Sequence, residues 1–412
     1  MTLWEELEYR GVIKDVAGEE ELKKKLNNES ISFYWGTDPT ADSLHIGHYS
    51  SLVTAKRLAK HGHKAILLVG GATGLIGDPR PTAEREIISY ETLNQNLQKL
   101  KAQVQKLFGN ENVEVVDNYD WTKNMDYISF LRDIGKYINV NYMLNKDIIA
   151  RRLDTGITYA EFSYTLIQGN DFLHLFENKN CILQAAGSDQ WGNITTGIDL
   201  IRKKTGKEAY GFTMPLVLDA NGNKFGKSEG NALWLDITKT SAYELYQYLF
   251  NSSDELVESY LKIFTFLSKE EIEDIMSKHK ESEHLRLAQK TLAFEVVKDI
   301  HSEEEALKAI KISEALFGGA VSELSVKDIE VAFKGVPTFE VEEGITLLDL
   351  LVNNGVAQSR REAREFLNAG SIVINDVKHQ DENEVITKDI AIEGKILVIR
   401  RGKKKQFIAK IN

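Results

Sequence analysis

The chain has 412 residues, more than one ordinary core holds, so we expect two or three domains. Its 42% hydrophobic and 27% charged residues are typical of folded chains, and its net charge of −11 argues against a uniformly basic nucleic-acid-binding protein. The single cysteine, Cys181, excludes an intrachain disulfide and a multi-thiolate metal site. This cysteine usage, and the lack of an apolar export signal or a membrane-length apolar stretch, predict a cytoplasmic protein.

The first strongly patterned segment predicts a β–α–β unit. Residues 31–36 alternate between two faces, as a strand does, and residues 47–61 carry apolar side chains at helical spacing. Residues 65–71 then form an unbroken apolar run, which is typical of a strand buried on both faces. Sheets built from such units bind ligands at the carboxyl ends of their strands.

The rest of the chain divides by composition. Further strands are expected at 113–117, 181–186 and 215–218, which gives an open, mainly parallel α/β sheet. Charged, amphipathic and glycine-poor segments follow and predict a helical region, and a turn-rich passage separates it from a small unit of short helices and strands. The expected domains are 1–220 (α/β), 221–330 (helical) and 345–412 (small α+β unit), with a linker at 331–344.

The end of the chain is basic although the whole is acidic. No acid follows Glu393, whereas seven lysines and arginines do. A solvated tail that favours solubility is one interpretation, and a surface for RNA is the other.

The turn after the first strand, residues 43–52, reads "SLHIGHYSSL" and carries two histidines around a glycine. Free backbone N–H groups and the positive dipole end of a helix start suit a phosphate chain, and His45 and Thr40 would add side-chain donors. Gly47 would let a flat base pack on the backbone. Two alternatives are a metal site on His45 and His48, for which no nearby carboxylate or cysteine completes the ligand set, and a pair of core histidines.

A second cluster lies at residues 219–231, after the last predicted strand. Lys224, Phe225, Gly226, Lys227 and Ser228 form a glycine-containing loop with two ammonium groups, which could fold over a triphosphate and neutralise developing charge. A solvated hairpin is the alternative, because lysine-rich glycine turns are common.

Together, H-I-G-H and K-F-G-K-S resemble the signature pair of class I aminoacyl-tRNA synthetases. The segments at 34–48, 70–79, 161–172 and 184–194 are similar to the amino-acid and nucleotide segments of bacterial tyrosyl-tRNA synthetases. Residues 359–375 resemble the small RNA-binding module that this family shares with a ribosomal protein. The resemblance implies a Rossmann-like catalytic domain, a helical anticodon-side domain and a C-terminal RNA-binding module.

The resemblance also implies the reaction, in which tyrosine and ATP form tyrosyl-adenylate and pyrophosphate and the tyrosyl group then passes to the 3′-end of tRNA(Tyr). Tyrosine would be held at its phenol and its α-ammonium by Tyr34, Asp171, Asp78, Tyr164, Gln168 and Gln190, with Gln184 behind them. The intermediate and the ribose and base would contact Asp38, Gly47, His48, Gly187, Asp189 and Ser228. The pyrophosphate moiety would be bound in the transition state by Thr40, His45, Lys224 and Lys227.

Partners follow from the same resemblance. ATP is a substrate whose triphosphate brings Mg²⁺, and no permanent cofactor or resident metal is expected. A homodimer is implied, formed near residues 130–144. The module would contact tRNA through its basic side chains, namely Arg360, Arg361, Arg364, Arg400, Arg401 and Lys403. The sequence departs from common family patterns at Ser51 and at Gly169-Asn170, and Arg80 and Arg85 are candidate phosphate contacts only.

Two other functions stay open. A tryptophanyl-type synthetase has the same fold, but Tyr34 with Asp171 favours a phenol, which can donate and accept a hydrogen bond, over an indole, which only donates. A catalytically inactive RNA-binding relative would keep the scaffold and lose the chemistry, and the presence of His45, Lys224, Lys227 and Asp171 argues against it.

Overall fold

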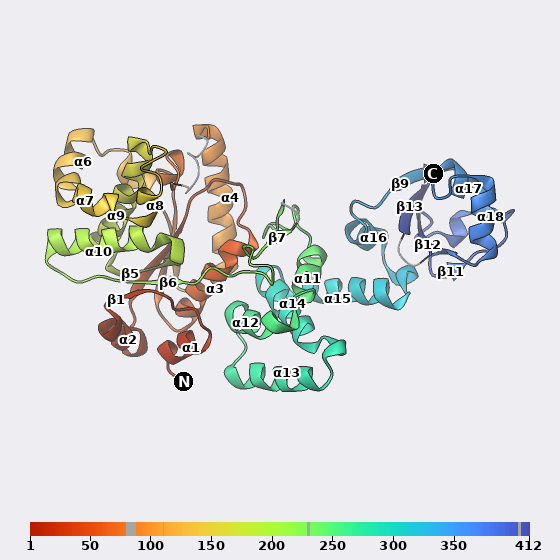
Figure 1. Cartoon of the computed structure of the whole chain (residues 1–412), viewed down its shortest axis with the longest axis horizontal. Coiled ribbons are helices and arrows are strands. Elements are labelled where there is room, and N and C mark those ends of the chain that lie inside the picture. Colours follow the sequence, from red (N-terminus) through yellow and green to blue (C-terminus); the bar gives the residue numbers. More distant parts are fainter. Residues whose placement is uncertain (80–87, 110, 229–230, 403–404) are drawn as a thin grey trace. The chain divides into compact units, whose positions relative to one another are not determined.

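The computed structural model describes residues 1–412 except 80–87, 110, 229–230 and 403–404. The chain forms two compact units (Figure 1). Unit 1 comprises Met1–Thr240 and Ser252–Val296, and unit 2 comprises Ser241–Asn251 and Val297–Asn412. Among the residues described, no helix is both long and apolar enough to cross a membrane.

Unit 1 is built on a six-stranded sheet with the order β1-β6-β5-β2-β3-β4. All neighbours are parallel except β1, which runs antiparallel to β6 at the edge. The strands are β1 (Val16–Ala17), β2 (Ser32–Thr37), β3 (Lys64–Val69), β4 (Val113–Asp117), β5 (Cys181–Gly187) and β6 (Tyr210–Met214). The predicted open, mainly parallel α/β sheet is confirmed.

One predicted strand is wrong. The strand expected at 215–218 lies instead at β6 (Tyr210–Met214), and Pro215 follows its last residue. Proline has no N–H to donate to a sheet, so the ladder ends there. The segment that was expected to be a strand therefore leaves the sheet and lines the pocket described below.

Helices cover both faces of the sheet, and the alternation along β2 assigns them. Tyr34 packs in one cluster with Phe172 and Leu173 of α9, whereas the indole of Trp35 donates to Ser51 of α3 on the other face. The helices up to residue 205 are α1 (Leu3–Tyr9), α2 (Glu19–Asn28), α3 (Ile46–Lys60), α4 (Tyr90–Phe108), α5 (Tyr119–Thr122), α6 (Tyr127–Asp133), α7 (Val140–Leu144), α8 (Asp147–Ala150), α9 (Tyr159–Lys179) and α10 (Trp191–Thr205).

Unit 1 also contains helices from the region predicted to be helical. They are α12 (Asp254–Phe264), α13 (Lys269–Glu281) and the first part of α14 (Leu287–Ile300). The buried side chains of Arg10 and Arg57 donate to the backbone carbonyl of Thr265, just beyond the end of α12. These charge-assisted bonds fix the end of α12 against α1 and the last turns of α3.

Unit 2 contains a five-stranded sheet, β11-β10-β12-β13-β9, that is buried on both faces. In β12, Leu397 and Ile399 pack with α17 and α18, whereas Ile396 and Val398 pack with α15 and α16. Its strands are β9 (Thr338–Val341), β10 (Ile372–Ile374), β11 (Val377–Lys378), β12 (Ile396–Arg401) and β13 (Lys405–Ile411). Its other elements are α11 (Ala242–Phe250), α15 (Glu303–Gly318), α16 (Val326–Ala332), α17 (Leu347–Asn353) and α18 (Arg360–Asn368).

The second face of this sheet gives a test of the packing. Ile408 of β13 is 4% exposed and lies in the cluster with α15 and α16, so Ile408→Ala should lower the free energy of unfolding by about 2–5 kcal/mol. Urea denaturation of the full-length chain measures the change. Lys405→Ala, on an exposed residue of the same strand, is the control and should change it little. Equal stability of the two variants would contradict the docking of the sheet on α15 and α16.

Candidate active site

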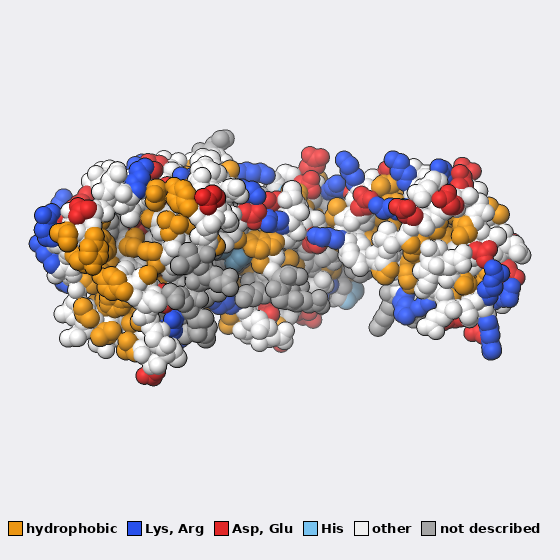
Figure 2. All heavy atoms as spheres, turned by 90° about the horizontal axis from the view of Figure 1, so that it is seen from above, with side chains coloured by type: hydrophobic (Ala, Val, Ile, Leu, Met, Phe, Trp, Pro, Cys, Tyr) orange, Lys and Arg blue, Asp and Glu red, His pale blue; other side chains and the backbone are white. Residues whose placement is uncertain are grey.

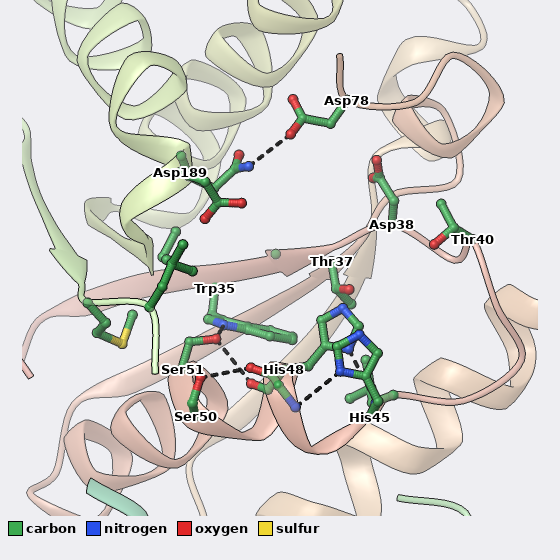
Figure 3. Close-up of a pocket in the computed structure, with 18 of the residues that line it drawn as sticks. Trp35, Thr37, Asp38, Thr40, His45, His48, Ser50, Ser51, Asp78 and Asp189 are labelled. Carbon is green, nitrogen blue, oxygen red and sulfur yellow. Dashed lines mark hydrogen bonds between the residues drawn. The ribbon is translucent and has the colours of Figure 1, made fainter. Parts of the chain in front are cut away.

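A pocket of about 550 Å³ lies within unit 1, at the carboxyl ends of β2 and β5 and at the first turn of α3 (Figure 3). Residues far apart in the sequence meet there. Of the residues predicted to bind tyrosine or ATP, those that line it are Tyr34, Asp38, Thr40, His45, Gly47, His48, Asp78, Tyr164, Gln168, Asp171, Gln184, Gly187, Asp189, Gln190 and Lys224. The side chains of Lys227 and Ser228, and Arg80 and Arg85 as a whole, lie outside the described part of the structure.

At one end of the pocket lies the buried carboxylate of Asp171, on α9. Trp121 Nε1 donates to its Oδ1 at 2.9 Å, and Asn118 Nδ2 donates to its Oδ2 at 2.9 Å. Burial raises the pKa of Asp171 to about 7, although these two hydrogen bonds oppose the rise by stabilising the charged form. The carboxyl group therefore changes charge near neutral pH and can accept a hydrogen bond from a buried ligand.

Tyr34 lies at the same end of the pocket as Asp171. Burial, reinforced by the Asp171 charge, raises the pKa of Tyr34 well above its usual value, so its hydroxyl stays protonated.

Within the described residues, the buried Oε1 of Gln184 has no hydrogen-bond partner. A buried polar group without a partner is costly, so this acceptor indicates a site that a ligand or a water completes.

Three carboxylates, from Asp38, Asp78 and Asp189, lie on one side of the pocket (Figure 3). Tyr164 donates its hydroxyl to Asp38 at 2.8 Å, and Gln190 donates its amide to Asp78 at 3.0 Å. Burial, with the charges of Asp38 and Asp189 added, raises the pKa of Asp78 to about 6, against the Gln190 hydrogen bond. Such a concentration of negative charge is suited to a cationic group such as an ammonium.

On the other side, the rings of His45 and His48 lie in contact, with ring centroids 3.9 Å apart and planes tilted by 31°. His45 is the N-cap of α3, and its Nδ1 accepts from the backbone N–H of Gly47 at 3.1 Å, which places the ring proton on Nε2. Burial, with the neighbouring His45 second, lowers the pKa of His48 to about 3, so that ring is neutral. Both residues line the pocket and keep part of their surface accessible there, although the protein largely surrounds the His48 ring, and this accessibility disfavours the interpretation as core histidines.

The loop with Lys224 is docked against the start of α3. Phe225 is buried and packs against Tyr260 and Phe264 of α12, with ring centroids 4.8 Å away in each case. Gly226 has φ +87° and lies so close to Ile46 that a Cβ would overlap the Ile46 side chain. A short hairpin does follow, formed by β7 (Lys227–Ser228) and β8 (Asn231–Ala232), but its base is anchored and Lys224 faces the pocket.

Three residues that hold Asp171 and Asp38 were not predicted as site residues from the sequence. Asn118 and Trp121 follow β4, and Thr73 donates to Asp38 Oδ1 at 2.6 Å. Thr73 belongs to the 70–79 segment, which the family resemblance had already marked. Asn118 and Trp121 could have been found from their position just after the strand predicted at 113–117, because ligands bind at the carboxyl ends of such strands.

In unit 2, the predicted RNA-binding arginines occupy α18 and β12. Arg360, Arg361 and Arg364 are exposed, and each forms an ion pair, with Asp349, Glu365 and Glu382 respectively. Arg401 instead donates to the backbone carbonyl of Val356 and lies 5.0 Å from the Phe366 ring centroid. Arg400 is exposed, and Lys403 lies outside the described residues.

Comparison with known proteins decides the family. Residues 26–318 match the family described as tRNA synthetases class I (W and Y), and residues 328–409 match the C-terminal domain of tyrosine–tRNA ligases. The chain is 48% identical to the tyrosine–tRNA ligase of Listeria welshimeri over 415 residues, covering 99% of each chain. The chain belongs to the tyrosine–tRNA ligase family. This membership confirms the resemblance drawn from the motifs.

Other relatives agree. The tyrosine–tRNA ligase of Streptococcus agalactiae is 47% identical, again with 99% of each chain covered. Among solved structures, the C-terminally truncated mitochondrial tyrosyl-tRNA synthetase of Aspergillus nidulans is 33% identical, with a TM-score of 0.69 over 77% of this chain and 94% of that one. The tyrosine–tRNA ligase family thus matches both the catalytic part and the C-terminal module of this chain.

The raised pKa of Asp171 predicts a pH-dependent stability difference. The folded state holds this proton more tightly than the unfolded chain, so ionisation of Asp171 lowers the free energy of unfolding as pH rises from about 4 to about 7. Asp171→Asn lacks this proton, so its stability relative to wild type should improve by on the order of 2–4 kcal/mol between pH 4 and pH 8. Urea denaturation of both proteins at the two pH values measures this.

Asp120→Asn, on an exposed carboxylate of the neighbouring α5, is the matched control. Its stability relative to wild type should be similar at both pH values. If Asp171→Asn behaves like Asp120→Asn, Asp171 is not a desolvated carboxylate in the folded protein.

Proposed function

We infer that the chain catalyses the ATP-dependent ligation of tyrosine to tRNA(Tyr). The observation that carries this inference is the buried Asp171 carboxylate, oriented by two donors beside Tyr34, in the same pocket as His45 and Lys224. A phenol donates to a carboxylate and accepts from a hydroxyl, whereas an indole only donates. The names of the relatives favour tyrosine over tryptophan in the same way.

Tyrosine would enter with its phenol at Asp171 and Tyr34. Its α-ammonium would lie near Asp78, Tyr164 and Gln168, with Gln190 adjoining, where the carboxylates compensate a positive charge. An amino acid that lacks the phenol would leave the buried Tyr34 hydroxyl without a partner and would not donate to Asp171, and this is unfavourable. Tyrosyl-tRNA synthetases are the established example of such discrimination, at about 10⁵-fold against phenylalanine.

Adenylate formation needs no general base, because the attacking tyrosine carboxylate is already ionised. It attacks the α-phosphate in line and releases pyrophosphate, so catalysis depends on positioning and on charge stabilisation. Thr40, His45, Lys224 and Lys227 would bind the β- and γ-phosphates as charge develops. The intermediate and the nucleoside would contact Asp38, Gly47, His48, Gly187, Asp189 and Ser228.

Mg²⁺ would enter with the triphosphate of ATP. In that complex the triphosphate oxygens supply ligands to the ion, so the protein need not provide a complete cage. Together with Lys224 and Lys227 of the signature loop (residues 224–228), Mg²⁺ would offset the negative charge that the pocket carboxylates add. The chain would act in the cytoplasm, where ATP, tyrosine and tRNA are available.

A homodimer would form over an apolar surface of unit 1. Tyr127, Ile128, Val140, Tyr142 and Leu153 are large hydrophobic residues with 43–67% of their surface exposed, and they come from α6, α7 and the segment after α8. Figure 2 shows hydrophobic side chains gathered at this end of the unit. A patch of this kind commonly marks a protein interface, and it includes part of the region expected at 130–144.

The exchange of pyrophosphate into ATP tests the function. With tyrosine the purified protein should catalyse exchange, and with the other nineteen amino acids it should show little, because only tyrosine satisfies both Asp171 and Tyr34. Tyr34→Phe, which removes one neutral hydrogen bond of about 0.5–1.5 kcal/mol, should retain most activity and admit more phenylalanine. Exchange that depends on tryptophan, or no exchange with any amino acid, would contradict the proposal.

The C-terminal module is proposed to bind tRNA through the exposed arginines of α18. The triple variant Arg360→Gln, Arg361→Gln, Arg364→Gln should lower tRNA charging and make tRNA binding less dependent on salt, because fewer phosphate contacts release fewer counterions. Adenylate formation should be unchanged, since the proposed adenylate site lies in unit 1. Binding at two salt concentrations and aminoacylation are the measurements.

Point substitutions are preferable to truncation near residue 335, because truncation would expose the apolar faces of α15 and α16. The control is the double variant Lys23→Gln, Lys24→Gln on exposed positions of α2. If the triple variant charges tRNA as well as this control does, the basic end is only a solvated surface.

A further inference from the structure

The segment that follows the signature loop pairs with the residues that begin α3. The backbone N–H of Ile46 donates to Leu233 at 2.9 Å, and the N–H of Leu235 donates to Leu44 at 2.8 Å. This antiparallel bridge sets Trp234 directly opposite His45. Leu233 also donates its backbone N–H to Gly226 at 3.1 Å, so backbone hydrogen bonds of Leu233 join the two motifs of the family signature, and Trp234 is the next residue along the chain.

The Trp234 side chain completes the contact. Its ring meets the His45 ring edge to face, with centroids 6.2 Å apart and planes at 65°, and it lines the pocket. The ring centroid of His48 lies 3.9 Å from that of His45, so the imidazole of His45 has aromatic neighbours in Trp234 and His48. Edge-to-face pairs at this separation are attractive by about 0.5–1.5 kcal/mol beyond their buried area.

Trp234 is itself held in place. Lys239 Nζ lies 5.4 Å from its ring centroid and also forms an ion pair with Asp42 at 2.6 Å. The backbone N–H of Trp234 donates to Thr240 Oγ1 at 2.9 Å. The Trp234 indole is thus held by contacts within its own short turn, and these contacts do not involve His45. It can therefore restrict the motion of the His45 ring.

We propose that Trp234 is a positioning residue for adenylate formation, which acts by holding the His45 imidazole toward the triphosphate. The inference rests on the proposed function. A hydrogen-bond donor assists a transition state only if its direction is set beforehand, and a histidine ring that can rotate about its side-chain bonds loses that advantage. Trp234 restricts this rotation without contacting tyrosine.

The test compares Trp234→Ala and Trp234→Phe with wild type. Trp234→Ala should lower the rate constant of tyrosyl-adenylate formation about tenfold, since a loss of about 1.4 kcal/mol is tenfold in rate, and should leave the dissociation constant of tyrosine unchanged. Trp234→Phe keeps an aromatic edge and should recover most of the rate. Rapid-quench measurements with tyrosine and ATP give the rate constant, and equilibrium dialysis gives the affinity.

Trp121→Phe is the matched control, because this tryptophan donates to Asp171, where the phenol of tyrosine is proposed to bind. It should weaken tyrosine binding more than it lowers the rate constant. A Trp234 variant that shifts tyrosine affinity as Trp121→Phe does, or one with a wild-type rate, would overturn the proposal. A failure of the wild-type chain itself to form tyrosyl-adenylate would instead overturn the proposed function.

A double-mutant cycle with His45→Ala separates action through His45 from an independent role. If Trp234 acts through His45, then His45→Ala and His45→Ala, Trp234→Ala should form adenylate at rates within about twofold of each other. A further tenfold loss in the double variant would mean that the two residues act independently, and the positioning role would be rejected. Thermal unfolding of each variant identifies any that are misfolded, and Trp234→Phe then carries the comparison.

Discussion

The first turn of α3 is the constraint on which unit 1 depends. A helix start leaves backbone N–H groups without intrahelical partners, and here the turn stands at the carboxyl end of a buried parallel strand. His45 caps part of it with its own ring, and the segment after the signature loop pairs with the residues on either side. Moving this turn would therefore disturb the side of the pocket that His45 and His48 line, the loop that carries Lys224 and the contact with α12 together.

The carboxylates of the pocket carry negative charge, opposite in sign to the positive dipole end at the start of α3. Asp38, Asp78 and Asp171 lie near one another under partial or complete burial, and this raises the pKa values of Asp78 and Asp171. Desolvation makes the charged form of a carboxylate less stable, so a ligand that brings a positive charge or a hydrogen-bond donor to these groups is favoured there. An ammonium beside Asp78 and a phenol beside Asp171 would add to the hydrogen bonds that these carboxylates already accept from the protein. Negative charge on one side and donors on the other suit an amino acid joined to a phosphate chain.

Much of this arrangement could be predicted from the sequence. Parallel strands leave strong local patterns, so β2, α3 and β3 were located within one or two residues, and the pairing of the two signature motifs pointed to a common site. The strand expected at 215–218 was wrong although Pro215 is its first residue, because proline is tolerated at the start of a strand as well as just beyond its end. Asn118 and Trp121 were missed because their role depends on β4 bringing them beside α9, which is a long-range contact without a local pattern. Trp234 is a similar case, since its register with His45 is set by tertiary pairing.

The C-terminal sheet shows how a small module can be made part of a larger unit. Successive residues of β12 face opposite sides, so a module with a single core would have apolar residues on one side only. Here Leu397 and Ile399 serve the core with α17 and α18, while Ile396 and Val398 pack on α15 and α16. The second apolar face ties the orientation of α18 to that of α15.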